Sequence, residues 1–408
     1  MRVITLEQLP SVLGHLPKNP RVITSGNFAT PRALLAAFDS VVPEYRLHML
    51  NAHQPIPDRE GVTYETAFVG PAMRNHPSLR YLPSRLSLLP VLVRDHVRPD
   101  VVLVNTSRRH YDTVSLGIEV NMLPMAIETA RAYGGVVIAQ SNASMPYTYG
   151  DAQIYESEID FLIEVDEPLA THDPVEADSI SQGIGDRIAA QISDGSTLQL
   201  GIGAVPDAVL GALIKRKGLR IWTEMFSDGV LNLHKAGALD EEVPITASFI
   251  FGSSELYEWL HLNRRVRMMR TEISNNPAAI ARQALMTSVN GALQVDLFDQ
   301  ANASRLKGRI YSGFGGAPDF TSGALHARGG QSFVALPSWH PKANVSTIVP
   351  LLTDPVTTLQ HSAVVTENGI AEVFGRTQGE QANNIIEQAA HPDAREELRE
   401  QAHAFGLL

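Results

Sequence analysis

A short segment near the N-terminus returns in the second half of the chain, and this repeat constrains the fold more than any other sequence feature. The two copies, Ser25–Phe38 (SGNFATPRALLAAF) and Leu200–Leu213 (LGIGAVPDAVLGAL), align without a gap and share one glycine, one proline and four apolar residues. Each copy follows an apolar run, turns at a glycine and begins a helix with a proline, which is tolerated because the first helical N–H groups have no acceptor. A second apolar run follows each helix. The repeat predicts the same strand–turn–helix–strand unit twice; the alternative is a chance similarity of two short Ala/Leu-rich helices.

Strands and helices are predicted to alternate along the chain. Apolar, β-branched runs bounded by Gly, Asn or Pro are typical of buried strands, and stretches with helical periodicity lie between them. The strands are predicted to begin at Arg21, Asp100, Gly134 and Phe161, with helices after Pro31 and before Gly134. This alternation predicts an α/β protein with mostly parallel sheets. We therefore expect two similar open α/β domains, residues 1–178 and 179–408, joined near Glu167–Gly183, where prolines and acids cluster.

Composition excludes several classes of protein. The chain has 408 residues, of which 44% are apolar, and this is enough for two domains with cores of their own. A formal net charge of −11 disfavours nucleic acid as a partner. No apolar run approaches the roughly 18 residues of a transmembrane helix, and the N-terminus lacks the apolar region of a secretory signal. The absence of cysteine removes disulfides, thiolate nucleophiles and cysteine-bound metals. We expect a cytoplasmic protein that binds neither nucleic acid nor membrane.

Familiar catalytic motifs are missing from the sequence. It has no GxxxxGK[ST] phosphate loop, HExxH zinc motif or GxSxG nucleophile elbow. The turn at Gly201 begins like a dinucleotide-binding fingerprint, but Pro206 takes the place of its third glycine. Among the 14 histidines, His48 and His53 are the closest pair in strand-like surroundings, and their spacing fits no common metal site. We therefore predict no metal site and histidines that are hydrogen-bonded or solvated.

A glycine-rich loop, Ser312–Phe320 (SGFGGAPDF), is a candidate binding site. Its glycines Gly313, Gly315 and Gly316 would let backbone N–H groups approach an oxyanion or a phosphate, because no Cβ stands in the way. The alternative is a tight structural turn.

Glu224 is the candidate reactive residue. It lies in IWTEM, after the helix of the second repeat, at the predicted end of a strand. Ligands of open α/β sheets bind at the carboxyl ends of strands. Its neighbours Trp222, Met225 and Phe226 would desolvate the carboxyl group, which raises its pKa and its nucleophilicity when ionised. The alternative is an exposed acid that caps a helix or forms a salt bridge.

The ordered series of motifs resembles the acetyl-CoA hydrolase/transferase family. This family belongs to the class I CoA-transferases and includes 4-hydroxybutyrate, butyrate and acetate CoA-transferases. One matching motif would be a weak signal, but a series in the family's order through most of the chain is specific. The matching stretches are SGNFATP, GVVIAQSNASMPYTYGDAQI, FLIEVDEPLA, LQLGIGAVPDAVL, IWTEMFSDGV, ISNNP, SVNGALQVDLFDQANAS, YSGFGGAPDF, GGQSFVALPS, AVVTENGIAEVFG and AAHPDAREEL.

The resemblance implies a fold, a site and substrates. The fold would be two similar α/β domains with the active site at their interface. Glu224 would be the nucleophile, Asn275 a polar contact for the thioester oxygen, and Gly313, Gly315 and Gly316 backbone donors to that oxygen and to CoA. The CoA-lining turn would consist of Gly201, Ile202, Gly203, Ala204 and Val205. The substrates would be acyl-CoA and a short-chain carboxylate, without a tightly bound cofactor or a metal, and the protein would be a homodimer.

The implied reaction is ping-pong transfer of CoA between carboxylic acids through a thioester of Glu224. Two alternatives stay open: an acyl-CoA hydrolase that uses the same glutamate, and a non-catalytic CoA-binding homologue. The second is motivated by departures from the family pattern at Ser107–Asp112, Ala317 and Leu359–His361. Glu367, in TENG, resembles the nucleophile motif of other class I CoA-transferases, but its position relative to the glycine turn disfavours it.

Two charged stretches complete the predictions. Asn263–Arg270 (NRRVRMMR) is predicted to be a strand with one solvated face, the alternative being a contact for the CoA phosphates. The tail from His391 has charges at helical spacing and predicts a solvated C-terminal helix.

Overall fold

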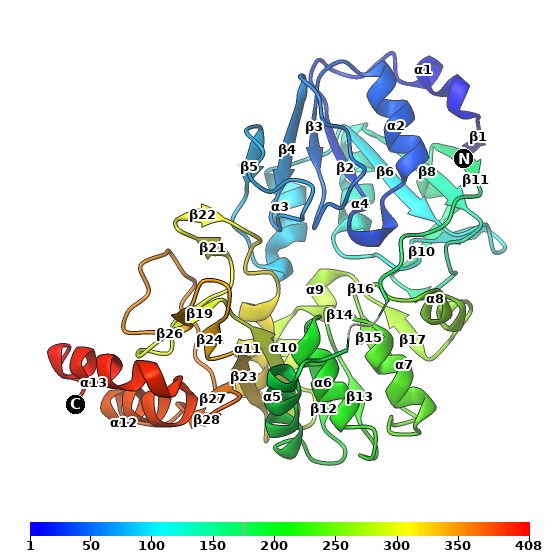
Figure 1. Cartoon of the computed structure of the whole chain (residues 1–408). Coiled ribbons are helices and arrows are strands. Elements are labelled where there is room, and N and C mark those ends of the chain that lie inside the picture. Colours follow the sequence, from blue (N-terminus) through cyan, green and yellow to red (C-terminus); the bar gives the residue numbers. More distant parts are fainter. Residues whose placement is uncertain (174–175) are drawn as a thin grey trace. The chain divides into compact units, whose positions relative to one another are not determined.

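The computed structural model describes residues 1–173 and 176–408 (Figure 1). Its contacts divide the chain into two compact units. Unit 1 consists of Met1–Asp173, Pro244–Ser274 and Ile310–Gly315, and unit 2 of Pro174–Val243, Asn275–Arg309 and Gly316–Leu408. The units therefore do not coincide with the predicted segments 1–178 and 179–408, because two stretches of the second half belong to unit 1. The predicted linker Glu167–Gly183 includes residues 174 and 175, which lie outside the described residues.

Unit 1 is built around an eight-stranded sheet in which every neighbouring pair of strands is parallel (Figure 1). The four predicted strands are all members of this sheet, so these predictions are confirmed. In sheet order its strands are β1 (Arg2–Val3), β11 (Phe161–Val165), β8 (Val136–Asn142), β6 (Val101–Thr106), β2 (Arg21–Thr24), β3 (Tyr45–His48), β4 (Val62–Thr66) and β5 (Leu79–Tyr81).

Helices cover this sheet as the sequence predicts. The apolar face of α2 (Arg32–Val41) packs Leu34 and Phe38 into the core of unit 1, and α4 (Leu123–Tyr133) ends at Gly134. Gly134 has the left-handed φ of 77° that favours glycine at a helix C-terminus. A third helix, α3 (Leu89–Asp95), also belongs to this unit.

A smaller parallel sheet in unit 1 contains the basic stretch. Its strands are β15 (Ile245–Ala247), β17 (Val266–Met268) and β9 (Tyr149–Gly150). Val266 and Met268 are buried, whereas Arg267 between them is exposed. The prediction of a strand with one solvated face is therefore confirmed.

Unit 2 repeats the architecture with six strands. All neighbouring pairs are parallel except the last, which is antiparallel. In sheet order the strands are β13 (Arg220–Ile221), β12 (Thr197–Leu200), β18 (Met286–Gly291), β23 (Gln331–Ala335), β27 (Ala363–Thr366) and β28 (Gly369–Glu372). Its longer helices are α5 (Ser179–Ala190), α6 (Ala204–Ala212), α7 (Asp228–Lys235), α11 (Ala317–His326) and α13 (Arg395–Ala404).

The predicted internal repeat is present in both sheets. In unit 1, β2 leads through a glycine turn and α2 to its parallel neighbour β3; in unit 2, β12 leads through a glycine turn and α6 to β13. In each sheet the strand before the glycine turn also pairs with a later strand on its other side, β6 or β18. Successive strands are therefore added first on one side of that strand and later on its other side. Open α/β sheets bind ligands at such a switch point.

The C-terminal helix is confirmed as α13, but it is not solvated on all sides. Leu398 and Ala402 are buried in the core of unit 2. None of the helices in the described ranges is long and apolar enough to cross a membrane.

The remaining helices and strands are short. They are α1 (Leu9–Val12), β7 (Thr113–Ser115), β10 (Gln153–Tyr155), β14 (Met225–Phe226), β16 (Phe249–Ile250), α8 (Ser254–Leu260), α9 (Thr271–Ser274), α10 (Pro277–Ile280), β19 (Gln294–Asp296), β20 (Ala301–Asn302), β21 (Arg305–Leu306), β22 (Arg309–Ile310), β24 (Trp339–His340), β25 (Val345–Ser346), β26 (Ile348–Val349), α12 (Gln378–Asn384), five 3₁₀ turns (Leu6–Gln8, Asn27–Ala29, Leu86–Leu88, Glu156–Glu158 and Pro392–Ala394) and one π turn (Ile385–Ala389).

Candidate active site

Glu224 lies just beyond the carboxyl end of a strand in unit 2. β13 ends at Ile221, and the Trp222 N–H still donates to the Leu198 carbonyl of the neighbouring strand β12. Glu224 follows two residues later, before the short strand β14 begins. The predicted position of Glu224 at a strand end is therefore confirmed, and it is the edge at which open α/β sheets bind ligands.

Two helices of unit 2 bring distant residues to this carboxylate. α10 and α11 pack against each other through Ile280, Phe320 and Ala324. Their approach is close, because a Cβ on Gly323 of α11 would lie 2.5 Å from the Cβ of Ile280. Asn275 lies just before α10, and Gly316 is the N-cap residue of α11. The packing of the two helices therefore sets the positions of both residues.

Glu224, Asn275 and Gly316 are in direct contact. The Asn275 Nδ2 donates a hydrogen bond of 2.9 Å to Glu224 Oε2. A Cβ on Gly316 would lie 1.8 Å from the same oxygen and 2.4 Å from Asn275 Nδ2. Real Cβ contacts are never that short, and the φ of Gly316 is −91°, so glycine is required here for space and not for conformation. Three of the predicted site residues thus meet at one oxygen atom.

The pKa of Glu224 is raised to about 7, chiefly by burial and to a smaller extent by a second carboxylate, Asp319. The amide of Asn275 and the backbone N–H of Gly316 act in the opposite direction, because they stabilise the charged form. Glu224 is partly buried and not sealed from solvent. A poorly hydrated carboxylate that a reactant can still reach has the properties of a nucleophile.

Asp319 was missed by the sequence analysis. It lies in the first turn of α11, three residues after Gly316, and it is fully buried. The available signal was helical periodicity, since a residue three positions beyond a helix N-cap lies on the same side of the first turn.

Gly313 and Gly315 belong to unit 1 and pack against a different segment. A Cβ on Gly313 would lie 2.6 Å from the carbonyl oxygen of Ala67, and Gly315 has a left-handed φ of 53° beside the ring of Phe68. The Val69 N–H also donates to the Ser312 carbonyl at 2.7 Å. In this part of the loop the glycines therefore allow close packing within unit 1, which was the alternative interpretation of the sequence.

The turn Gly201–Val205 joins β12 to α6, as predicted. Gly203 is the N-cap residue of α6 and has a φ of 113°, which residues with a Cβ rarely adopt. A Cβ on Gly201 or Gly203 would meet no atom within 4 Å, and the side chain of Ile202 is 48% exposed. The first residues of the helix, Ala204 and Val205, are partly buried. The turn thus presents uncovered backbone at a helix N-terminus, where an anionic group is stabilised.

The rival glutamate, Glu367, holds a turn of unit 2 together. Its Oε2 accepts the Ser338 N–H at 2.9 Å and its Oε1 accepts the Ser338 hydroxyl at 2.5 Å. Both carboxylate oxygens are thus engaged in a structural contact, which agrees with the preference for Glu224.

His48 differs from the sequence expectation. It is fully buried in β3, and neither ring nitrogen has a hydrogen-bond partner within the described residues, so the expectation of a hydrogen-bonded or solvated histidine was wrong there. Burial lowers the pKa of His48 to about 4 and keeps the ring neutral. The described part of the chain contains no cluster of three or more side chains that could hold a metal ion.

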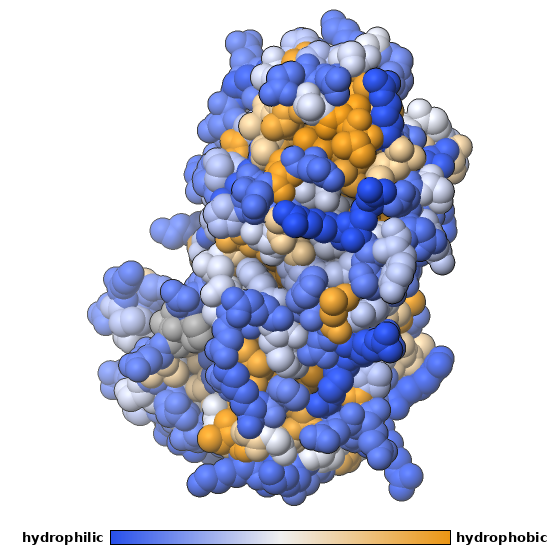
Figure 2. All heavy atoms as spheres, turned by 90° about the vertical axis from the view of Figure 1, so that its right-hand side faces the viewer, coloured by the Kyte–Doolittle hydropathy of each residue, from blue (hydrophilic) through white to orange (hydrophobic). Residues whose placement is uncertain are grey.

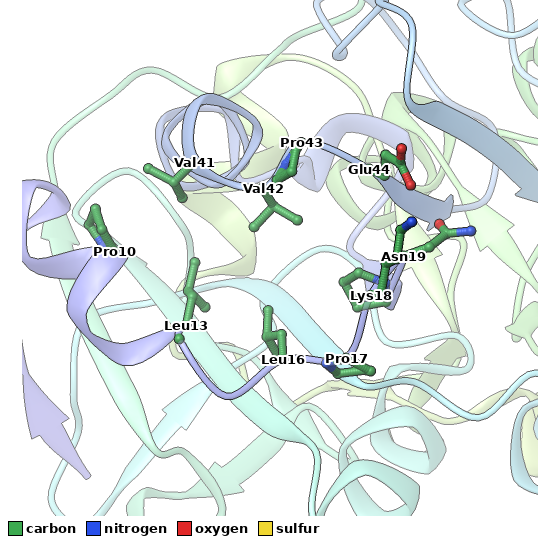
Figure 3. A pocket seen from close by; sticks show the side chains of 12 residues that line it. Pro10, Leu13, Leu16, Pro17, Lys18, Asn19, Val41, Val42, Pro43 and Glu44 are labelled. Carbon is green, nitrogen blue, oxygen red and sulfur yellow. The ribbon is translucent and has the colours of Figure 1, made fainter.

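An apolar pocket of about 340 Å³ lies in unit 1 between α1 and the end of α2. Figure 3 shows the side chains of Leu13, Leu16 and Val42 around this space, with Lys18 and Glu44 near one end. Apolar residues also gather on the surface in the upper part of Figure 2. The residues that line the pocket include none of the predicted site residues, so it has no part in the candidate chemistry.

Comparisons with known proteins show which family this chain resembles. Residues 252–402 match the family model described as acetyl-CoA hydrolase/transferase C-terminal domain. The 4-hydroxybutyrate coenzyme A transferase of Clostridium kluyveri is 35% identical over 385 residues, which cover 90% of this chain and 89% of that protein.

Two solved structures extend the likeness to the whole fold. RipA from Yersinia pestis is 28% identical, with a TM-score of 0.92 over 100% of this chain and 98% of that one. The 4-hydroxybutyrate CoA-transferase of Porphyromonas gingivalis is 30% identical, with a TM-score of 0.81 over 99% and 98%. The chain is an enzyme with the CoA-transferase fold, and it belongs to the acetyl-CoA hydrolase/transferase family.

Proposed function

We propose that this enzyme moves CoA between short-chain carboxylic acids by a ping-pong mechanism in which Glu224 is the nucleophile. The observation that carries the proposal is the contact of Glu224 with Asn275 and with the bare backbone of Gly316. This arrangement leaves a desolvated carboxylate beside two donors, and beside a position where no side chain fits.

The first half-reaction forms the enzyme thioester in two steps. A Glu224 carboxylate oxygen attacks the thioester carbonyl carbon of acyl-CoA, and the C–S bond breaks. CoA departs as its thiolate, and the acyl group is now joined to Glu224 in a mixed anhydride. The thiolate then attacks the glutamyl carbonyl carbon, and the acyl group departs as a free carboxylate. Glu224 is left as its CoA thioester.

The second half-reaction reverses these steps with another acid. The incoming carboxylate attacks the Glu224–CoA carbonyl and expels CoA thiolate, which gives a second mixed anhydride. The thiolate attacks the new acyl carbonyl, so a new acyl-CoA leaves and the Glu224 carboxylate is regenerated. The thioester bond energy is retained throughout, which is why no phosphoryl donor is needed.

The other predicted residues supply binding and charge stabilisation in this proposal. Each tetrahedral intermediate carries an oxyanion that needs preorganised donors, and loss of one such donor typically costs about 3 to 4 kcal/mol. We assign this part to Asn275 and to the backbone of Gly316. Gly201, Ile202, Gly203, Ala204 and Val205 would line the CoA site with open backbone.

The test is to trap the enzyme thioester. After incubation with an acyl-CoA, borohydride reduction and tryptic digestion, a reduced side chain is expected in the peptide Ile221–Lys235, which contains one glutamate. Glu224→Ala protein should show no modification there. Turnover without any modification of this peptide would exclude Glu224 as the nucleophile.

Hydrolysis is the second candidate, and the partial exposure of Glu224 favours it because water can approach the anhydride or the CoA thioester of this residue. Thioester loss measured with and without added acetate separates the two reactions. Full-rate loss without acetate rejects the transferase. Acyl-CoA binding with neither turnover nor a Glu224 adduct would favour the non-catalytic homologue that the altered loops suggest.

The proposed assembly rests on the family resemblance, and the proposed location rests on the composition of the chain. A homodimer in the cytoplasm is the proposed form, and light scattering of the purified protein would test the dimer by its mass. A monomer mass at assay concentration would contradict it.

A further inference from the structure

A partly exposed asparagine, Asn290, lies near the end of the central strand β18 of unit 2, and the proposed reaction does not use it. β18 pairs with β12, the strand that leads to the turn Gly201–Val205. The Gly201 N–H still donates to the Val289 carbonyl at 3.4 Å. Asn290 therefore directly follows the residue whose carbonyl holds the first residue of the turn.

The sheet register places the Asn290 side chain on the face that α11 covers. Paired residues of neighbouring strands share a face, and so do residues two positions apart in one strand. Ser288 pairs with Ser332 of β23, and the Ser332 hydroxyl donates to the Thr321 hydroxyl oxygen of α11 at 3.3 Å. Asn290 comes two residues after Ser288, so it lies on the same face as well.

Asn290 and Gly316 lie at the same edge of this sheet. α11 packs against β18 and β23, and it ends at His326, shortly before β23 begins at Gln331. The end of α11 therefore lies at the amino edge of these parallel strands, and its N-cap residue, Gly316, lies at their carboxyl edge. Gly316 meets the Glu224 carboxylate there. Asn290 thus shares both a face and an edge of the sheet with the candidate active site.

Two buried side chains fix the orientation of the Asn290 amide. Its Nδ2 donates to Ser288 Oγ at 2.9 Å and to Gln199 Oε1 at 3.4 Å. The Ser288 hydroxyl also donates to Gln199 Oε1, at 2.7 Å. Gln199 is 4% exposed and Ser288 is fully buried, so water does not compete for these bonds. The amide of Asn290 is therefore preorganised.

These bonds leave Asn290 with free capacity as an acceptor. Both hydrogens of its Nδ2 have acceptors, whereas its Oδ1 accepts one long bond in the described part of the chain, from Gln199 Nε2 at 3.4 Å. An amide oxygen has two lone pairs. Asn290 is thus arranged to accept a hydrogen bond from a ligand.

The chemistry of the proposed substrates decides which ligand group fits this acceptor. A simple carboxylate and the acyl carbonyl carry only acceptors, which an amide oxygen does not bind. The pantetheine arm of CoA carries two amide N–H groups, one close to the sulfur and one farther along the arm. These amides are the donors nearest to the reacting thioester.

The spacing of the strands favours the amide farther from the sulfur. β13, β12 and β18 are neighbours in sheet order and lead to Glu224, to the turn Gly201–Val205 and to Asn290. Neighbouring strands are about 4.8 Å apart, so the strands of Glu224 and Asn290 are separated by about 10 Å. An extended pantetheine arm covers a similar distance between its sulfur and the farther amide.

We infer that Asn290 is a binding residue for CoA, whose Oδ1 accepts a hydrogen bond from the pantetheine amide farther from the sulfur. Gln199 and Ser288 are positioning residues that hold its amide in this orientation. The inference rests on the proposed function, because it requires a CoA thioester that reaches Glu224 across the turn Gly201–Val205. It adds recognition of the pantetheine arm to that function.

Thioesters of decreasing length test this inference. The substrates are an acyl-CoA, the matching acyl-pantetheine, and the matching acyl-N-acetylcysteamine, which keeps only the amide closer to the sulfur. Asn290→Ala should lower kcat/KM about 3- to 10-fold with the first two substrates, which is the usual effect of one lost hydrogen bond. With acyl-N-acetylcysteamine the loss should be less than about twofold, because the partner amide is absent.

Two further variants complete the series. Ser288→Ala should show the same dependence on substrate length with a smaller loss, since it only loosens the Asn290 amide. Asn383→Ala removes an exposed asparagine of the same unit and is the matched control, which should behave as the wild type with all three substrates.

Two kinetic outcomes would overturn the inference. One is an equal loss with all three thioesters in Asn290→Ala, which would indicate a general structural effect. The other is an unchanged kcat/KM with acyl-CoA. If Asn290→Ala does not fold, the same comparison of substrates in Ser288→Ala decides.

Calorimetric titration with CoA separates this inference from the proposed function, because it requires no turnover. Asn290→Ala should raise the Kd of CoA about 3- to 10-fold, and Asn383→Ala should leave it unchanged. This result would support the inference even if Glu224 were not the nucleophile. A trapped Glu224 thioester together with an unchanged Kd in Asn290→Ala would refute the inference and leave the proposed function intact.

Discussion

Glu224 of unit 2 and Glu119 of unit 1 resemble each other in their electrostatics and differ in their access. Burial raises the pKa of each to about 7, and each accepts a hydrogen bond from an asparagine amide. Glu224 is partly exposed and faces a glycine backbone, whereas Glu119 is buried between two asparagines. Desolvation alone therefore does not make a carboxyl group a nucleophile. It makes the group responsive near neutral pH, and access decides whether it reacts or holds neighbouring residues.

The largest expected difference between the two glutamates is in turnover. Glu224→Gln and Glu224→Ala should lower kcat by about 10⁴-fold or more while CoA binding persists, because the covalent path is lost. Glu119→Gln, the same change in the other unit, should cost less than about tenfold, since no bond to substrate is removed. Steady-state assays with acyl-CoA and acetate give both values.

The exposed Glu397→Ala in α13 serves as the control for these assays. Comparable losses of kcat in Glu224→Gln and Glu119→Gln would contradict the assignment of different roles to the two glutamates. Retained activity in Glu224→Ala would move the search for the nucleophile to Glu367.

The next largest effect is expected from Gly316→Ala. The added Cβ would overlap Glu224 Oε2, so both the carboxylate and Asn275 must move, and kcat/KM should fall by about 10² to 10³-fold. Gly211→Ala is the matched control, because a Cβ there meets no atom within 4 Å and alanine favours the α6 helix. Equal activity of the two variants would show that the close approach at Gly316 has no functional role.

The free energy of unfolding should fall as pH rises, and both glutamates should contribute to this fall. Each has a folded-state pKa near 7, above its ordinary value of 4.5, so its contribution is complete below pH 4.5 and is lost as pH rises to about 7. The loss is at most about 3 kcal/mol for each group. Glu224→Gln and Glu119→Gln should each remove one such loss, and denaturant unfolding from about pH 5 to about pH 8 measures it. A variant whose stability falls with pH as steeply as the wild type would show that its glutamate titrates normally.

The smallest expected effect is a shift in the pKa of Glu224 when its charged neighbour is removed. Asp319 raises the pKa of Glu224, and no charged group does so for Glu119. Asp319→Asn should move the acid limb of the pH–kcat/KM profile downward by less than about one pH unit. The pH dependence of stability that Glu119→Gln removes should not move, and a shift there would contradict the separate origins of the two pKa values.

Local sequence was sufficient to predict the repeated β–α–β unit in each sheet and the placement of Glu224 after β13. It did not predict that residues 244–274 and 310–315 join unit 1, since no local pattern records which sheet a returning segment packs against. Gly316 was identified from the glycine-rich loop and Asn275 from the family resemblance, and their contact with Glu224 depends on the packing of α10 against α11. Asp319 had only the signal of helical periodicity after Gly316, and no sequence pattern marked Glu119.

The sequence by itself determined the periodic features: parallel strands, amphipathic helices, a glycine at each turn, and a glutamate at a strand end. These depend on interactions between residues a few positions apart, which hydrophobic periodicity and backbone preferences encode directly. The tertiary structure decided what Glu224 touches, and it alone showed that Glu119 is desolvated. Glu224 and Asn275 are 51 positions apart and Glu119 and Asn27 are 92 apart, and the pKa of a buried group depends on every segment that excludes water from it.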